Sequence, residues 1–331
     1  MKLSILDQSP IAANRTARQA LHDSIGLAKL GEQLGYTRYW IAEHHHLSGL
    51  ASSSPEVMLG VIGAQTETIR LGPGAVLLPY YKPMKVAEQY HTLATLFPNR
   101  IDIGIGRAPG GSAEATNALS DNFLQQVFNM SHLVDELLFF IDNQFPKGHP
   151  SEKVRATPVP DIAPIPWTLG TSEKSAIFAA EKGLPYVFGH FMSDEDGKAI
   201  VKKYKQSFEK RPNGQEKEVI ITVSVFCAET DELAEKIAMS SLIWSIQKDK
   251  GEGESGILSI EDALAYELTE KEKEKLMSLK KKAVIGNPQS VKRKLEKLQA
   301  KYEVDEMMIV TNTYATADRY ESYRLLAAEL L

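Results

Sequence analysis

The segment Trp40-Ile-Ala-Glu-His-His-His46 joins an apolar run to a cluster of ionisable side chains. The run from Thr37 to Ile41 predicts a buried strand. The strand ends in one carboxylate and three imidazoles, and histidine can donate or accept a proton near neutral pH. Strand ends of this kind lie at a sheet rim or barrel mouth, where α/β enzymes carry out catalysis. A polar loop with three solvated histidines is the alternative, and the strand-end position favours the functional interpretation.

Strands and helices alternate along the rest of the chain. The eight predicted strands cover residues 3–6, 37–41, 69–78, 100–107, 167–170, 184–188, 219–226 and 307–311. This alternation predicts a parallel sheet with right-handed crossovers. Eight such units favour a closed (β/α)8 TIM barrel that forms a single domain over residues 1–331. A doubly wound sheet is the alternative, but no Gly-x-Gly-x-x-Gly follows the first strand, which argues against a Rossmann dinucleotide site.

Glycine and proline mark several of the expected element boundaries. Gly35 is expected to end a helix over residues 16–34 in a left-handed conformation. Ser54 and Pro55 predict the start of another helix, with the serine as its cap. One continuous helix is expected over residues 124–140.

The strand Arg100-Ile-Asp-Ile-Gly-Ile-Gly-Arg107 alternates strictly between isoleucine and smaller or polar residues. Its isoleucines are predicted to face one side, and Asp102, Gly104 and Gly106 the other. Glycine weakens a strand and often marks a place where a ligand must approach the backbone.

The composition describes an ordinary enzyme-sized globular protein. The chain has 331 residues, of which 43% are hydrophobic and 24% charged, with a net charge of −5 and no basic tail, so nucleic-acid binding is not expected. The single cysteine, Cys227, excludes an internal disulfide and a cysteine-based metal cluster. The N-terminal apolar run is too short for a signal peptide, and no apolar run is long enough to span a membrane. We therefore expect a cytoplasmic protein without a membrane partner.

Residues 248–282 differ from the rest of the chain in being rich in lysine, glutamate and glycine. A charged insertion of this kind is expected on the surface. It can be a simple solvated segment or a mobile lid over the barrel mouth, with its glycine-rich start as a hinge.

Two further strand ends carry residues suited to phosphate. Arg107 offers a fixed fork of donors, and Thr171-Ser172 opens a helix whose free N–H groups favour an anion. Ser175 lies one turn further and could add a hydroxyl. Taken singly, Arg107 is better explained as a surface ion pair and Ser172 as an ordinary helix cap. Their joint placement at a strand end and a helix start favours a phosphate site equally, so both interpretations stay open.

A metal site is not expected, although histidines and Glu43 could in principle bind zinc or iron. Consecutive side chains point in different directions, and the other strand ends add little beyond Asp7 and His190. No His-x-His or His-Glu-x-x-His spacing occurs in the chain.

A set of motifs in a fixed order resembles the bacterial luciferase-like flavin monooxygenases. The motifs are Leu6-Asp-Gln-Ser-Pro10, Trp40-Ile-Ala-Glu-His-His45, Gly74-Ala-Val-Leu-Leu-Pro79, Arg100-Ile-Asp-Ile-Gly-Ile-Gly-Arg107, Leu169-Gly-Thr-Ser172, Gly183-Leu-Pro185, Ile285-Gly-Asn-Pro288 and Val304-Asp-Glu-Met-Met-Ile309. Each motif is weak alone, whereas the ordered set is specific to the superfamily and not to one substrate.

The resemblance implies a (β/α) barrel that binds reduced flavin mononucleotide (FMN) and works as a homodimer. A histidine matching His44 would act beside the flavin and support its peroxyflavin intermediate. Residues matching Arg107, Ser172 and Ser175 would hold the phosphate, and the Gly74-Ala75 bond would be a cis peptide against the flavin ring. The cofactor-binding set that we expect is Glu43, His45, Gly74, Ala75, Gly106, Arg107, Thr171, Ser172 and Ser175.

We therefore expect a two-component, FMN-dependent monooxygenase acting on paired donors with incorporation of molecular oxygen. A separate flavin reductase would supply the reduced FMN, and the substrate would be a small organic molecule. Bacterial luciferase itself has a reactive cysteine where this chain has Gly106, which argues against light emission and a long-chain aldehyde substrate. The alternatives are a deazaflavin-dependent hydride-transfer enzyme and a flavin-binding protein without turnover, with a metal-dependent hydrolase a distant third.

Overall fold

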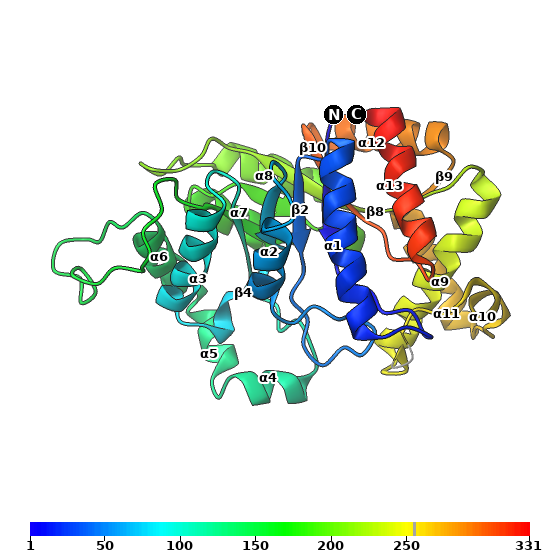
Figure 1. Ribbon diagram of the computed structural model, residues 1–331, viewed down its shortest axis with the longest axis horizontal. Coiled ribbons are helices and arrows are strands. Elements are labelled where there is room, and N and C mark those ends of the chain that lie inside the picture. Colours follow the sequence, from blue (N-terminus) through cyan, green and yellow to red (C-terminus); the bar gives the residue numbers. More distant parts are fainter. Residues whose placement is uncertain (254–255) are drawn as a thin grey trace.

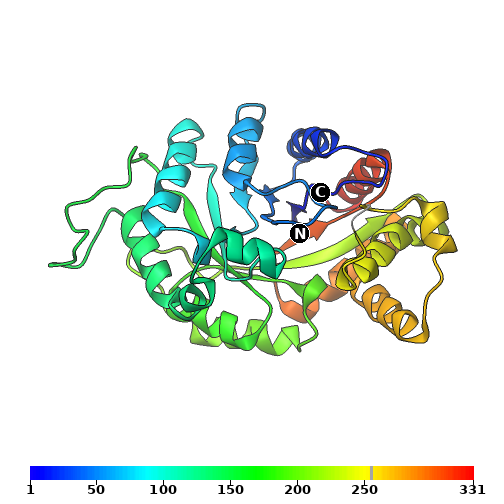
Figure 2. The same ribbon diagram turned by 90° about the horizontal axis from the view of Figure 1, so that it is seen from below.

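Parallel strands surrounded by helices make up the computed structural model, which describes residues 1–253 and 256–331 (Figures 1 and 2). The paired strands follow the order β3-β2-β1-β10-β8-β7-β6-β5-β4, and every pair is parallel. The strands are β1 (Lys2–Asp7), β2 (Arg38–Ile41), β3 (Arg70–Pro73), β4 (Val76–Leu77), β5 (Asp102–Gly106), β6 (Ile165–Gly170), β7 (Tyr186–Phe188), β8 (Val219–Cys227) and β10 (Glu306–Val310).

The barrel has eight strand positions because β3 and β4 are the two halves of one predicted strand. The Gly74–Ala75 peptide bond, which is cis, separates these halves. A parallel bridge between Leu71 and Ile101 joins β3 to the start of β5, and the Leu71 N–H donates to the Arg100 carbonyl at 2.7 Å. The predicted α/β TIM barrel is thereby confirmed.

Helices cover the outside of the barrel (Figure 2). They are α1 (Ala17–Leu34), α2 (Pro55–Gly63), α3 (Pro83–Leu96), α4 (Ala113–Leu119), α5 (Phe123–Phe128), α6 (Met130–Ile141), α7 (Glu173–Glu181), α8 (Gly197–Ser207), α9 (Asp231–Asp249), α10 (Ile260–Ala265), α11 (Glu270–Lys282), α12 (Pro288–Tyr302) and α13 (Thr316–Leu330), with short 3-10 turns η1 (Leu78–Tyr80) and η2 (His190–Met192). Gly35 ends α1 at φ 86°, as predicted. In the described part of the chain, no helix is both long and apolar enough to cross a membrane.

Several predicted boundaries were wrong in detail. The continuous helix over 124–140 is two helices, because Asn129 ends α5 and begins α6 with a non-helical backbone. Pro55 lies in the first turn of α2, but the Ser54 side chain makes no capping hydrogen bond. The sequence also gave no sign of α4 or of β9 (Val284–Gly286), which pairs with the far end of the long strand β8 outside the barrel.

The barrel interior is filled by large side chains, of which Trp40 and Trp167 are fully buried and pack edge to face. A Cβ atom on Gly104 would lie 3.1 Å from Trp40 Cζ3 and 2.3 Å from the Pro73 carbonyl oxygen. A Cβ atom on Gly72 would lie 2.8 Å from the Trp40 indole nitrogen. Gly104 therefore makes room for a tryptophan, whereas we expected glycine in this strand to admit a ligand.

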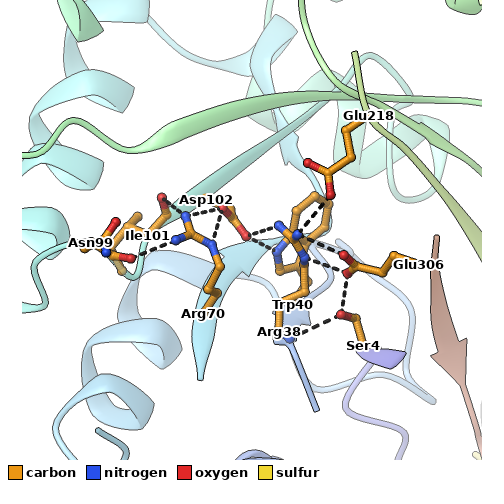
Figure 3. Close-up of polar contacts among 9 residues, drawn as sticks. All are labelled: Ser4, Arg38, Trp40, Arg70, Asn99, Ile101, Asp102, Glu218 and Glu306. Carbon is orange, nitrogen blue, oxygen red and sulfur yellow. Dashed lines mark hydrogen bonds and ion pairs between the residues drawn. The ribbon is translucent and has the colours of Figure 1, made fainter. Parts of the chain in front are cut away.

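A buried ionic network closes the floor of the barrel at the amino ends of the strands (Figure 3). The Arg38 guanidinium donates to Asp102 at 2.9 Å and to both carboxylate oxygens of Glu306, at 2.7 and 3.0 Å. The Trp40 indole N–H donates to the same Asp102 at 3.0 Å, and Arg70 donates to it from β3 at 2.6 Å. The two buried carboxylates are thus compensated by two arginines, and the network ties four strands together.

The charged insertion over 248–282 lies beside the barrel (Figure 1). Helices α10 and α11 pack against α9 through a small apolar cluster that includes Ile243, Ile246 and Ala263. The backbone of Ile257 bonds to the Ile11–Ala13 loop that precedes α1. Residues 254 and 255 of the predicted insertion lie outside the described residues. None of its described residues is among those that line the cavity at the carboxyl ends of the strands, which is described below.

We predict that Arg38→Met lowers the free energy of unfolding by about 3–5 kcal/mol, because it leaves two buried carboxylates without their shared cation. Arg324→Met, which removes an exposed ion pair with Glu321, should change it by no more than about 0.5 kcal/mol. Denaturant unfolding measures both values. Equal stability of the two variants would contradict the role assigned to the floor network.

Candidate active site

A cavity of about 470 Å³ opens at the carboxyl ends of the strands. Its size falls in the range of small-molecule and cofactor sites. The sequence-predicted residues that line it are Glu43, His44, Gly74, Ala75, Gly106, Arg107, Thr171, Ser172 and Ser175. His45 does not border the cavity in the described part of the chain. Residues from four separate strand ends therefore meet in one place.

His44 follows β2 and lies at the wall of this cavity. Its backbone N–H donates to the Ser52 carbonyl at 2.9 Å, which fixes the loop, and its Nδ1 atom is buried with no partner among the described residues. Burial, the positive charge of Lys248 on α9 and the neighbouring His45 lower the pKa of His44 to about 4. The imidazole is therefore neutral at physiological pH and can donate or accept one hydrogen bond.

Glu43 is buried, and both of its carboxylate oxygens contact polar groups of the protein. One carboxylate oxygen accepts from the Tyr81 hydroxyl at 2.6 Å and lies 2.9 Å from His45 Nε2. The other accepts from the Leu77 N–H at 3.0 Å. Glu43 thus fixes the position of β4 through the Leu77 N–H. The His45 ring contacts the same carboxylate and helps to hold it in place. In the described ranges, these residues do not form a group of three or more metal-ligating side chains.

A polar region that could bind a phosphate lies where β5 and β6 end, and it is called the phosphate pole below. Arg107 is exposed at the cavity edge, and Ser172 caps α7, so the interpretation of Ser172 as a helix cap holds. The Ser175 hydroxyl donates to the Ser172 carbonyl at 2.7 Å and lies 2.9 Å from the Tyr186 hydroxyl. The first N–H groups of α7 have no partner within the helix, and with Arg107 they can bind an anion. The pole combines a cation with a helix N-terminus.

The cavity wall next to this pole is apolar around the Gly74–Ala75 peptide. A Cβ atom on Gly106 would lie 2.9 Å from the Ala75 Cβ atom. A Cβ atom on Gly74 would lie 2.4 Å from the Leu6 side chain. Gly74 and Gly106 therefore allow the backbone of this wall to pack closely against Leu6 and Ala75.

Two strand-end residues considered as metal partners point elsewhere. Asp7 bonds to Arg319 at 2.5 Å and to the Tyr39 hydroxyl at 2.5 Å, outside the barrel. His190 Nδ1 lies 2.9 Å from the Tyr302 hydroxyl, on α12. The lining residues that were not predicted from the sequence include Gln8, Phe191, Met192 and Thr222. Of these, Gln8 could have been found by extending the side-chain alternation of β1 beyond its end.

The sequence signature of the luciferase-like monooxygenases matches residues 1–302, and the chain belongs to this family. It is 36% identical over 333 residues to N-acetyl-S-alkylcysteine monooxygenase of Bacillus subtilis (strain 168), with 100% of this chain and 98% of that protein covered. The crystal structure of apo-MsnO8 is similar, with 32% identity, a TM-score of 0.88 and coverage of 99% and 97% of the two chains.

A more distant structure shares the fold. This is the oxygenating constituent of 3,6-diketocamphane monooxygenase from Pseudomonas putida, solved in complex with FMN. It is 20% identical, with a TM-score of 0.74 and coverage of 100% of this chain and 97% of that one.

We predict that NMR titration gives a pKa of about 4 for His44 and that Lys248→Met raises it. The direction follows because removal of a nearby cation makes the imidazolium less unfavourable. Lys29→Met, which removes an exposed lysine on α1, serves as the control and should leave the pKa of His44 at the wild-type value. An unchanged pKa in Lys248→Met would show that the lysine does not act on His44.

Proposed function

We propose that this protein is the oxygenating component of a two-component monooxygenase that uses reduced FMN and dioxygen on a small organic substrate. The observation that carries the proposal is that one cavity contains a cationic phosphate pole at Arg107 and a neutral histidine, His44. The proposal includes a separate reductase as the source of reduced flavin and a homodimer as the working form. Membership of the monooxygenase family supports the reaction class.

The residues of the cavity fit FMN. Arg107 and the N-terminus of α7 would hold the phosphate, since both favour a dianion. The wall around the Gly74–Ala75 peptide would accept the isoalloxazine ring, because its lining residues Gly74, Ala75 and Gly106 carry little or no side chain. His44 would lie beside the ring with its neutral imidazole.

Reduced FMN, when bound, supplies the two electrons with which one oxygen atom of dioxygen enters the substrate and the other leaves as water. His44 would hold a proton at Nε2 for the reacting oxygen, since its Nδ1 atom is buried away from solvent. Leu6, Leu169 and Val187 would exclude water from the cavity, because they are apolar and line it. Arg107 would fix the position of the cofactor.

Two alternatives remain distinguishable by experiment. A deazaflavin-dependent enzyme would transfer hydride and need no dioxygen, and a simple flavin-binding protein would not turn over. N-acetyl-S-methylcysteine is a suitable first probe substrate, because a relative of 36% identity is named for N-acetyl-S-alkylcysteines. Dioxygen consumption with an oxygenated product would support the monooxygenase over both alternatives.

We predict that Arg107→Met weakens FMN binding about tenfold or more, because the variant loses a charge-assisted bond to the phosphate. Riboflavin, which lacks the phosphate, should bind both proteins equally. Titration of the tryptophan fluorescence measures each affinity, and a deazaflavin cofactor is compared in the same assay. Equal FMN affinity in wild type and variant would show that Arg107 does not bind the phosphate. Tighter binding of the deazaflavin than of FMN would favour the deazaflavin-dependent enzyme.

We predict that His44→Ala uncouples the reaction. With a flavin reductase and the probe present, a larger fraction of the reduced FMN should yield free hydrogen peroxide, and less should yield oxygenated product. FMN affinity should change little, since the histidine does not touch the phosphate pole. The exposed residue His22 provides the control variant His22→Ala. An unchanged ratio of product to peroxide in His44→Ala would contradict the role given to this histidine.

A further inference from the structure

We propose that Gln8 and Asn312 form the substrate-recognition pole of the cavity and that they bind a secondary amide group. The role of the bound group as a substrate rests on the proposed monooxygenase function. The binding of a secondary amide does not depend on that function. Gln8 lines the same cavity as His44, whereas Asn312 is not among the lining residues and lies next to Gln8. Neither side chain takes part in the phosphate pole or in the support of Glu43.

The strand register places the two residues side by side. β1 and β10 are adjacent and parallel, with Ile5 opposite Ile309. The same offset, continued three residues beyond that pair, brings Gln8 level with Asn312 just past the carboxyl ends of both strands. Neighbouring residues on parallel strands face the same side of the sheet.

The alternation of side chains along the strands decides whether Gln8 and Asn312 face the inside or the outside of the barrel. Leu6 and Val310 belong to the apolar cluster inside the barrel. The residues that follow point outward, since Asp7 bonds to Arg319 and the Thr311 hydroxyl donates to the Val225 carbonyl. The next pair, Gln8 and Asn312, therefore returns to the inside, directly above Leu6 and Val310 at the barrel mouth.

The two carboxamides share one hydrogen bond, from Asn312 Nδ2 to Gln8 Oε1 at 2.7 Å. Asn312 is only 6% exposed, and its Oδ1 atom is buried without a partner among the described residues. A buried acceptor without a donor is costly, so a bound group that supplies an N–H would relieve that cost. The pair therefore keeps one unsatisfied acceptor beside a residue that lines the cavity.

The chemistry of the pair indicates the ligand class. Two carboxamides that share one hydrogen bond leave an NH2 group on one side chain and a carbonyl on the other, whichever way the amides are turned. A secondary amide presents a carbonyl acceptor and an N–H donor next to each other. It is thus the simplest group that satisfies both free positions at once.

The position in the barrel separates this pole from the cofactor. The eight strand positions run β1, β2, β3/β4, β5, β6, β7, β8 and β10 around the barrel. The phosphate pole lies at β5 and β6, and the carboxamide pair lies at β10 and β1, which is the opposite side of the mouth. His44 follows β2, the neighbour of β1. A cofactor held at the phosphate pole would therefore leave the carboxamide pair to a substrate next to His44.

Calorimetric binding to the FMN-loaded protein tests the proposal with two probes. N-acetyl-S-methylcysteine carries a thioether, a carboxylate and a secondary amide, whereas 3-(methylsulfanyl)propanoate lacks the amide. We expect the wild type to bind the first probe about tenfold more tightly, and Gln8→Leu to lose this preference. Gln8→Glu, which keeps the size but lacks the NH2 group, should lose it too. Gln33→Leu, at an exposed position of α1, is the matched control and should keep it.

Three outcomes would overturn the proposal. The first is equal binding of both probes, or no binding of either, by the wild type. The second is a preference that survives in Gln8→Leu and Gln8→Glu. The third is a loss of FMN affinity in both variants when no probe is present, which would assign the pair to the cofactor. If the wild type failed to bind FMN, the proposed function would fail instead, and the same titration on the cofactor-free protein would still test the pair.

Discussion

The indole of Trp40 connects the floor of the barrel to its mouth, and most of the structure depends on how it is accommodated. Its N–H donates to Asp102 in the ionic floor. Its ring lies against Gly72 and Gly104, where any Cβ atom would collide with it, and near Gly74 at the cavity wall. A large rigid side chain of this kind, fully buried, leaves little freedom to the strands around it. The barrel therefore holds its upper strand ends in fixed positions.

This rigidity matters because the site is assembled from strand ends that are far apart in the sequence. Arg107 provides a cation at one side of the mouth, and the carboxamides of Gln8 and Asn312 lie at the other. His44 lies between the two poles and stays uncharged because of its burial and the nearby Lys248. A neutral imidazole does not compete with Arg107 for a phosphate, and it retains a nitrogen for proton transfer. The cation that can bind a phosphate thus lies at one end of the cavity.

Strand-and-helix alternation predicted the barrel, and the strand-end rule predicted that His44, Arg107 and Ser172 would meet in one cavity. Side-chain direction within loops was not predictable, since it depends on contacts across the fold. His45 turns to Glu43, and His190 turns to Tyr302, for this reason. The expectation that glycine at position 104 admits a ligand is wrong, because Trp40 occupies the space beside it and the sequence does not show this packing. The packing of the charged insertion against α9 depends on a small apolar cluster. This packing was not predicted because lysine and glutamate dominate the sequence of the insertion.

A crystal structure of the protein with FMN tests the central claim most directly. We predict that the phosphate lies within hydrogen-bonding distance of Arg107 and the first turn of α7. The isoalloxazine ring should lie against Gly74 and Ala75 with His44 at its edge, and Gln8 should remain free of the cofactor. A phosphate bound elsewhere, or a ring placed outside this cavity, would contradict the account.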